Sequence, residues 1–370
     1  MREVEHLFYV NTLGVDYQNG GYVVYLQIIN PETIAKKSSG QSTRPGAWIA
    51  KGHGATVIGA IHNIYATTQR RIYWGHTTSL IFSEKALRHV GIQELLENPT
   101  RYFEFRYLPW VFCTNESIPD LMNIQPIIEG SPIFSVLSDP IDMYGQSSCV
   151  TPQALHSMIR DMFEPGRPSL IPELSIKKSD WFDVKKTYPE PVISGVGVLR
   201  NGRLLGSLSR EQLNGLRWFT PTAHRTIVTL RKKGKPVAVL TLRTPKHTVQ
   251  AVLKGTRLSF DIQVNTDGYI SEQMLQIPEK QLKTMVAEEM EHEIRQTFAS
   301  GLLFKTDIYG LSQSLYRRNP QAFRRWMRAG GNSLLHKNSL RHITIRVAIR
   351  SSGRTMEPGN HYVTGDSQAQ

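Results

Sequence analysis

The stretch "LFYVNTLGVDYQNGGYVVYLQII", residues 7–29, decides how the chain begins to fold. Leu7–Val15 and Tyr22–Ile29 are rich in β-branched and aromatic residues, and Asn19-Gly20 between them is a strong signal for a tight turn. Two such runs around such a turn predict an antiparallel hairpin. The chain therefore opens with a pair of strands.

Beyond this hairpin the pattern alternates between helical and strand periodicity. Residues 36–54, "KKSSGQSTRPGAWIAKGHG", have no periodicity and predict a long exposed loop. The expected elements that follow are a helix at Ala55–Thr68, a strand at Arg70–Glu84, a helix at Ser83–His89, a strand at Arg101–Cys113 and a helical turn at Glu116–Ile124. This order predicts a mixed α/β N-terminal domain over residues 1–125.

The middle of the chain gives weaker signals. Thr151-Pro152 predicts the N-cap and first position of a helix that runs to Phe163. A strand is expected at Ser169–Ile176. The two prolines in "DWFDVKKTYPEP", residues 180–191, indicate a boundary near residue 190, so residues 126–190 are expected to form a smaller middle domain or extension.

The last third of the sequence has the clearest pattern. Short runs with strand character are separated by turns at Gly202, Gly234 and Gly255 and predict an antiparallel meander with one buried face. The expected strands are Val192–Leu199, Thr226–Arg231, Val237–Leu242, Thr248–Leu253 and Leu258–Val264. Two helices, from Pro278 to Gly301 and from Asn319 to Gly330, and a last strand at Ile343–Ile349 complete a domain over residues 191–350. We therefore predict an α+β, multidomain fold with a flexible tail at 351–370.

The composition is that of a globular protein, with 40% hydrophobic and 20% charged residues. An excess of 44 Lys and Arg over 31 Asp and Glu gives a net charge of +13, which favours anionic partners. No nucleic-acid-binding motif accompanies this charge, so we expect no nucleic acid partner. No apolar stretch approaches the roughly 20 residues of a membrane-spanning helix, and the chain as given is expected to be soluble. Cys113 and Cys149 are better explained as two buried thiols than as one disulfide.

Three short motifs suggest chemistry, and each has a simpler structural explanation. His76 in "RRIYWGHTTSLIFSE", residues 70–84, lacks a motif that would complete a catalytic site, and we expect a hydrogen-bonded histidine that shares a strand face with Trp74 and Thr78. Glu289 and His292 match half of a di-metal motif, but the neighbouring glutamates, including Glu293, favour a solvated helix face. The glycines of "KGHGATVIGAI", from Lys51, fit a flexible start of a helix better than a phosphate loop.

A cluster of arginines lies on and before the second C-terminal helix, beside Trp326. Such a basic patch is able to contact anionic headgroups or an acidic partner, although a solvated helix face is the simpler explanation. Its members are Arg317, Arg318, Arg324, Arg325 and Arg328. We take them as a candidate interaction patch.

Four long segments resemble a known family, the C subunit of bacterial spore germinant receptors (Ger(x)C). They are "VEHLFYVNTLGVDYQNGGYVVYLQIINP" (4–31), "RRIYWGHTTSLIFSEKALRHVGIQELLENPTRYFEFR" (70–106), "GVGVLRNGRLLGSLSREQLNGLRWF" (195–219) and "KTDIYGLSQSLYRRNP" (305–320). The resemblance runs from about Val4 to about Ile349. Within it, Trp74, Gly75 and His76 form a structural signature.

The resemblance implies a non-enzymatic lipoprotein, attached by a lipidated cysteine to the outer face of the spore inner membrane. It also implies partnership with membrane-embedded A and B subunits in nutrient-triggered germination, with no cofactor, no metal and no catalytic residues. Because no leader or lipobox cysteine precedes Arg2, we expect this chain to be the soluble ectodomain, with its anchor removed. A free-standing nutrient-binding protein, or a small hydrolase using His76 or the Glu289 and His292 pair, remains the alternative.

Overall fold

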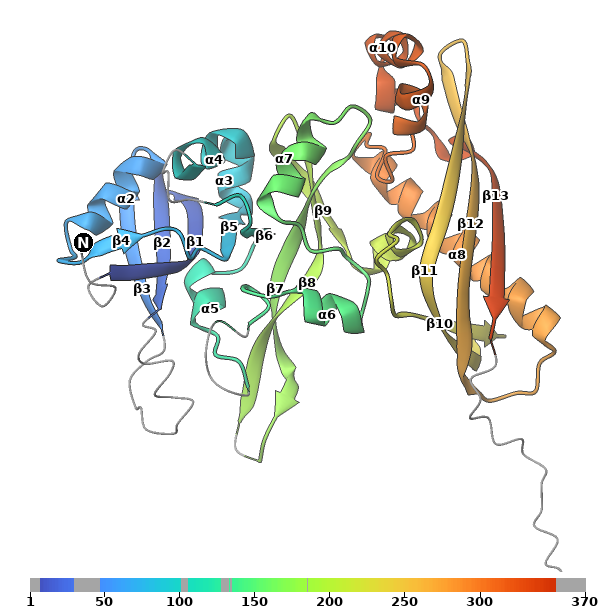
Figure 1. Cartoon of the computed structure of the whole chain (residues 1–370), viewed down its shortest axis with the longest axis horizontal. Coiled ribbons are helices and arrows are strands. Elements are labelled where there is room, and N and C mark those ends of the chain that lie inside the picture. Colours follow the sequence, from blue (N-terminus) through green and yellow to red (C-terminus); the bar gives the residue numbers. More distant parts are fainter. Residues whose placement is uncertain are drawn as a thin grey trace, which may run out of the picture.

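The computed structural model describes residues 7–29, 47–100, 106–127, 133, 135–184 and 186–350. Within these ranges the chain forms two β-sheets that lie beside each other along the long axis of the molecule, each with its own helices (Figure 1). The fold is thus mixed α and β and multidomain, as predicted.

The first sheet has nine strands in the order β3-β2-β1-β5-β6-β7-β8-β9, with β4 paired to β1. Its strands are β1 (Leu7–Gln18), β2 (Gly21–Ile29), β3 (Ala47–Gly54), β4 (Arg71–Tyr73), β5 (Ser79–Ser83), β6 (Trp110–Thr114), β7 (Ser169–Phe182), β8 (Thr187–Arg200) and β9 (Arg203–Ser209). Strands β1, β5, β6 and β7 run parallel, whereas the outer strands pair antiparallel. The opening hairpin is confirmed, because β1 and β2 pair across Asn19 and Gly20, both at positive φ.

Helices cover both faces of this sheet, because consecutive residues of its inner strands are apolar and point alternately to the two faces. Leu80 and Phe82 of β5 pack on the face covered by α2, α3, α4 and α7, and Ile81 packs on the face covered by α5. The helices of this half are α2 (Val57–Tyr65), α3 (Glu84–His89), α4 (Ile92–Thr100), α5 (Ile118–Asn123), α6 (Ile141–Gln146) and α7 (Leu155–Phe163).

The second sheet consists of β10 (Thr226–Lys232), β11 (Lys235–Lys254), β12 (Arg257–Gln273) and β13 (Leu340–Ile349). The first three strands form the predicted antiparallel meander, and β13 joins β12 in parallel. One face packs against the long helix α8 (Glu279–Leu303) through a core that includes Phe260, Met290 and Phe298. The short helices α9 (Gln313–Arg318) and α10 (Pro320–Arg328) follow α8, and α10 begins at the predicted Asn319 cap, whose Oδ1 accepts a hydrogen bond from Ala322 N at 2.9 Å.

Several predictions about the first half are wrong. The expected loop at 36–54 contains strand β3, which pairs with β2 along its whole length, and residues 36–46 lie outside the described ranges. Gly52 and Gly54 of β3 do not give a flexible start to a helix. They let α2 lie directly on the strand, because a Cβ at Gly52 would come within 2.1 Å of the Ala60 carbonyl oxygen.

Other boundaries also differ from the prediction. The single strand expected at Arg70–Glu84 is two short strands, β4 and β5, separated by a turn. Of the strand expected at Arg101–Cys113, residues 110–113 belong to β6, residues 106–109 are not in a strand, and residues 101–105 lie outside the described ranges. Helix α7 starts at Leu155 after an Ala154 N-cap that makes no side-chain hydrogen bond, so the Thr151-Pro152 cap is wrong.

Strand β8 contains the segment expected to begin the C-terminal meander, but it pairs with β7 and β9 in the first sheet. The two strands expected at Val237–Leu242 and Thr248–Leu253 are one strand, β11, with an irregularity between Arg243 and Lys246. The domain limits at 125 and 190 stay a prediction, and the first sheet takes strands from both sides of each position. The tail at 351–370 lies outside the described residues.

Candidate functional site

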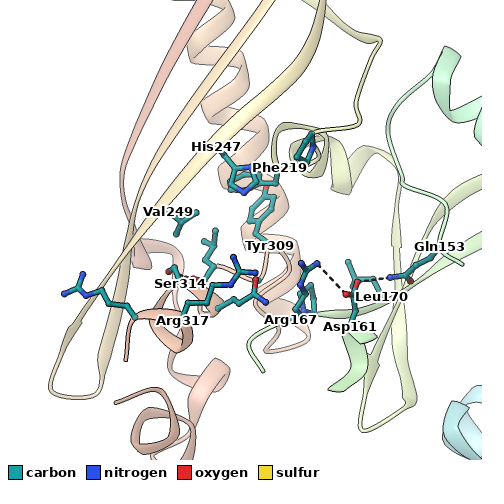
Figure 2. A pocket seen from close by; sticks show the side chains of 16 residues that line it. Gln153, Asp161, Arg167, Leu170, Phe219, His247, Val249, Tyr309, Ser314 and Arg317 are labelled. Atoms are coloured by element: carbon teal, nitrogen blue, oxygen red, sulfur yellow. Dashed lines mark hydrogen bonds and ion pairs between the residues drawn. The ribbon is translucent and has the colours of Figure 1, made fainter. Parts of the chain in front are cut away.

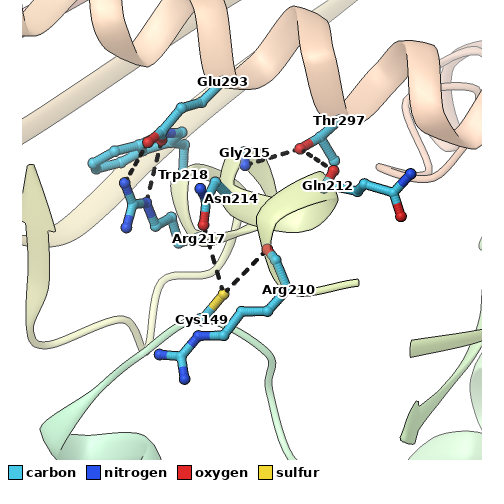
Figure 3. Close-up of polar contacts among 9 residues, drawn as sticks. All are labelled: Cys149, Arg210, Gln212, Asn214, Gly215, Arg217, Trp218, Glu293 and Thr297. Atoms are coloured by element: carbon cyan, nitrogen blue, oxygen red, sulfur yellow. Dashed lines mark hydrogen bonds and ion pairs between the residues drawn. The ribbon is translucent and has the colours of Figure 1, made fainter. Parts of the chain in front are cut away.

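A 3₁₀ segment, η3 (Glu211–Phe219), connects the two sheets and lies on helix α8 (Figure 3). Thr297 of α8 holds it with two hydrogen bonds: its Oγ1 accepts from Gly215 N at 3.0 Å and donates to the Gln212 carbonyl at 2.8 Å. A Cβ at Gly215 would approach the Glu293 carbonyl oxygen to 2.6 Å. The connector therefore needs glycine at this position to reach the helix.

Glu293 of α8 forms the polar centre of this contact. Its carboxylate accepts hydrogen bonds from Arg217 Nη2 at 2.5 Å, Arg217 Nε at 3.2 Å and Trp218 Nε1 at 2.7 Å. Burial raises the pKa of Glu293, while Arg217 and Trp218 oppose that shift. The expectation that Glu293 belongs to a solvated helix face is wrong, because its side chain is buried against the connector.

The two cysteines are free and buried, as expected. Cys149 lies beside the start of η3, with its Sγ 3.9 Å from the Arg210 carbonyl oxygen and 3.9 Å from Asn214 Oδ1 (Figure 3). Burial raises the pKa of both the Cys149 and Cys113 thiols. Cys149 thus packs at the contact between the first half of the chain and the connector.

A cleft of about 870 Å³ opens between the α7–β7 turn and the β11–α9 region (Figure 2). Three rings lie along one side: Phe219 is 4.9 Å from His247 and 4.1 Å from Tyr309, measured between centroids. The two halves meet at its edge, where Gln313 Nε2 donates to Glu164 Oε1 at 2.9 Å. The cleft is therefore lined by both halves and bounded by a direct contact between them.

The charged residues that line this cleft are mainly cationic, namely Arg167, Arg317 and Arg318. Asp161, which also lines the cleft, is already engaged by Arg167 at 3.6 Å and by Gln153 Nε2 at 3.2 Å. Within the described part of the chain, Gln153 Oε1 and His247 Nδ1 are buried without a hydrogen-bond partner. Burial lowers the pKa of His247 and so favours the neutral imidazole. Such a lining suits a small anionic group that also carries hydrogen-bond donors.

The predicted arginine patch lies on α9 and α10, and all five guanidinium side chains are exposed. Only Arg317 and Arg318 line the cleft, while Arg324, Arg325 and Arg328 extend the positive surface along α10. Residues 308–350 contain nine Lys and Arg residues and no Asp or Glu, so this surface has no acidic residue nearby in sequence to neutralise it. The arginine surface, meaning these five residues, is thus adjacent to the cleft.

His76 does not lie on a strand and is not buried. It occupies the turn between β4 and β5, where its exposed ring packs edge-on against Tyr9, with centroids 5.2 Å apart, and lies 5.7 Å from Tyr73. Trp74 is the buried member of the signature, and its Nε1 donates to Tyr65 Oη at 3.3 Å. A Cβ at Gly75 would meet the Tyr73 ring at 2.8 Å. The three residues together therefore shape a tight aromatic turn.

Glu289 and His292, which match half of a di-metal motif, are not joined by further metal-ligating side chains in the described part of the structure. Across the described ranges, no group of three or more His, Cys, Asp or Glu side chains is placed to hold a metal ion, and His292 is exposed on α8. None of the helices in those ranges combines the length and the apolar character that crossing a bilayer requires.

Comparison with known families gives two matches that follow one another along the chain. Residues 1–176 match the spore germination protein N-terminal domain, and residues 194–353 match the spore germination B3/GerAC-like C-terminal domain.

Individual relatives agree with these matches. The chain is 22% identical to spore germination protein KC of Bacillus subtilis (strain 168), over 99% of this chain and 94% of that protein. It is 20% identical to spore germination protein B3 of the same organism, over 74% of this chain and 70% of that protein. The crystal structure of the GerBC protein has a similar fold, with a TM-score of 0.56 and 16% identity over 95% of this chain and 100% of that one.

Proposed function

The chain belongs to the Ger(x)C family of spore germination proteins, and on this premise we propose that it is the C subunit of a germinant receptor and acts with membrane-embedded A and B subunits. The observation that carries the proposal is the order and extent of the two family matches, which together span nearly the whole described chain. The subunit would be lipid-anchored on the outer face of the spore inner membrane. It would have no catalytic activity of its own.

The arginine surface is the part of the chain that we assign to an anionic partner in this assembly, either the headgroups of the membrane or acidic loops of the A and B subunits. Its five exposed guanidinium groups and the absence of acidic residues from 308–350 support that assignment. A lipid anchor with one chain holds a protein only weakly, so a second electrostatic contact would add to its residence at the membrane.

Crosslinking in spores tests the partnership. A photoreactive residue at Arg324 or Arg328 is expected to crosslink to the A or B subunit, whereas one at Glu288, which is exposed on α8, serves as the matched control. Absence of any crosslink to either subunit, from these and from further surface positions, would contradict the proposal.

Liposome sedimentation distinguishes between anionic lipid and an acidic protein as the partner of the arginine surface. Charge reversal at Arg317, Arg318, Arg324 and Arg325 is expected to weaken binding to anionic vesicles if lipid is the partner. Equal binding of the variant and the wild type would assign the arginine surface to protein.

The absence of catalysis is tested by alanine at His76, Glu289 and His292. Normal nutrient-triggered germination with each variant is the expected result. The aromatic surroundings of the His76 ring support this expectation, because a general base needs a reacting group or an orienting carboxylate within reach.

A second candidate function, nutrient binding, is favoured by the cleft between the two halves. Its arginines, its aromatic side and its two unpaired buried polar atoms are the features of a site for a small polar molecule. Calorimetry of the purified chain with amino acids and sugars tests it. Micromolar binding that is lost in Arg167→Ala would place nutrient sensing in this subunit. No heat change on addition of amino acids or sugars would contradict nutrient binding and would not affect the proposed receptor role.

A further inference from the structure

Strands β7 and β8 continue beyond the sheet as a separate two-stranded ribbon. Trp181 pairs with Tyr188 and Phe182 with Thr187 near its end, after a register shift that begins at Lys177. Figure 1 shows this ribbon running out past the elements on either side of it. The outer part of each strand is exposed, in contrast to the buried segment Ile171–Leu174 of β7.

Large apolar side chains lie at the end of this ribbon. Trp181 is 58% exposed, Phe182 75% and Val184 104%. Exposed apolar residues that occur singly on a protein surface need no explanation, but three within four positions at a projecting tip form a continuous apolar end. Leaving them in water forgoes the free energy that their burial would release.

The acidic groups around the tip are engaged within the ribbon itself. Asp180 forms an ion pair with Lys177 at 2.8 Å. The Asp183 carboxylate accepts hydrogen bonds from Tyr188 Oη at 2.6 Å and Lys186 N at 2.8 Å, and Asp183 N donates to the Lys186 carbonyl at 2.9 Å. These contacts satisfy part of the polar backbone and carboxylate groups of the turn, which lowers the cost of moving it out of water.

Cationic groups stand just behind the apolar end. Lys186 Nζ lies over the Tyr188 ring, 4.7 Å from its centroid, and Lys178 is exposed on the opposite strand. Because Lys177 is paired with Asp180, Lys178 and Lys186 are the positive charges that the described part of the ribbon presents to its surroundings. The ribbon thus has Trp181, Phe182 and Val184 at its tip. Behind the tip lie Tyr188 and the two lysines.

The order of these residues favours a lipid surface as the occupant. Trp and Tyr concentrate at the interface between hydrocarbon and water, and Lys reaches from there to the phosphate level. A narrow projecting tip also suits insertion among headgroups, whereas a protein docking site commonly offers a broader patch of about 800 Å². We propose that the β7–β8 tip, formed by Trp181, Phe182 and Val184, inserts into the headgroup region of a lipid bilayer, with Lys178 and Lys186 at the level of the phosphates.

This proposal adds a membrane contact to the proposed function and also stands apart from it, since it concerns the purified chain and lipid alone. The ribbon and helices α9 and α10 lie at opposite ends of the view in Figure 1. A bilayer that receives the tip is therefore on the far side of the molecule from the arginine surface. The arginine surface would then remain available to a protein partner.

Vesicle binding of the purified chain is the test. The probes are vesicles of phosphatidylcholine alone and of phosphatidylcholine mixed with phosphatidylglycerol, and the variant is Trp181→Ser, Phe182→Ser, Val184→Ser. We expect the partition coefficient of the variant to fall at least about tenfold for both vesicle types, because the loss is apolar. Phe163→Ser is the matched control, since Phe163 is 72% exposed on α7, and it is expected to bind as the wild type does.

Tryptophan fluorescence gives a second readout. Brominated lipid is expected to quench part of the emission of the wild type, and Trp181→Phe is expected to remove that quenching while it retains vesicle binding. Thermal melts of all variants check that they remain folded.

Three results would overturn the proposal. They are no binding of the wild type to either vesicle type, equal binding of the triple variant, or binding that needs phosphatidylglycerol and disappears only on charge reversal of the arginine surface. Loss of crosslinks to the A or B subunit in the triple variant, with vesicle binding unchanged, would instead assign the tip to a protein. Failure of the receptor role would appear in the spore crosslinking and not in these measurements.

Discussion

Glu293 is the buried acidic group in the contact between the connector and α8. It is a buried carboxylate held by one guanidinium and one indole N–H, and loss of one partner of a buried pair leaves the other charge uncompensated. Glu293→Ala is expected to lower the free energy of unfolding by about 3–5 kcal/mol, measured by chemical denaturation. Glu288→Ala, at an exposed position of the same helix, is expected to change it by less than about 0.5 kcal/mol. Equal effects of the two substitutions would contradict this role.

The signature turn gives a second prediction at this scale. Trp74 is 2% exposed, and Trp74→Ala is expected to cost about 3–5 kcal/mol. His76 makes ring contacts from an exposed position, so His76→Ala is expected to cost less than about 1 kcal/mol, below the effect that a buried hydrogen-bonded histidine would have. Thermal melts compare the two, and a larger loss for His76→Ala would contradict the ranking.

His247 predicts a pH dependence of stability. Burial lowers its pKa in the folded protein below the unfolded value of 6.5, so between these two pKa values the unfolded chain binds more protons. The free energy of unfolding is therefore expected to fall as pH drops below 6.5, and His247→Gln should reduce that slope. Denaturation curves at a series of pH values from neutral to mildly acidic measure it. The same slope in both proteins would show that other groups are responsible.

At this scale the sequence allowed part of the candidate site to be predicted. The sequence predicts the cluster of five arginines, because they are close together along the chain, on and just before a capped helix. The prediction for Glu293 is wrong because the sequence pattern considers only its neighbours on the same helix, whereas its partners Arg217 and Trp218 come from a distant segment. The sequence does not indicate His247 and Arg167 as site residues, because they are far apart along the chain and line one cleft only in the folded structure.

At the scale of elements, the connector η3 depends on one glycine. A Cβ at Gly215 would lie 2.2 Å from Tyr309 Oη and 2.6 Å from a backbone oxygen, so the segment must move away from α8. Gly215→Ala is expected to cost about 1–3 kcal/mol, in spite of the usual preference of a helix for alanine. Gly145→Ala on α6 is the control, since a Cβ there meets nothing within 4 Å. Denaturation curves of the two variants decide, and equal stability would show that η3 tolerates the added methyl group.

The elements that sequence patterns predicted well are those with long apolar periods, such as α8, or with a strong turn, such as the β1–β2 hairpin. Strand β3 was not predicted, because its glycines and lysine are typical of loops. It exists because β2 offers a free edge for pairing and because the two glycines leave room for α2. Its conformation is set by its neighbours and not by its own propensity.

For the whole molecule, the sheet topology predicts where the chain can be cut to give a fragment that folds by itself. A fragment of residues 210–350 retains η3, α8 and every strand of the second sheet, and it is expected to fold with a cooperative thermal transition. A fragment of residues 191–350 also carries most of β8 and all of β9 without β7, which leaves a strand edge unpaired and is expected to favour aggregation. Analytical ultracentrifugation and melting of both fragments compare them. A monomeric and equally stable 191–350 fragment would support the boundary predicted at 190.

The parallel pairing of β13 with β12 has a consequence for the order of events during synthesis. Strand β12 ends at Gln273 and β13 begins at Leu340, so at about 5–20 residues per second the nascent sheet waits roughly 3–13 s for its last strand. During that interval the backbone groups at the outer edge of β12 are unpaired, and the side of α8 that β13 later covers is exposed to solvent. The second half of this protein is therefore completed last, by a strand close to the end of the described chain, and a message truncated before Leu340 would yield a product with an exposed strand edge.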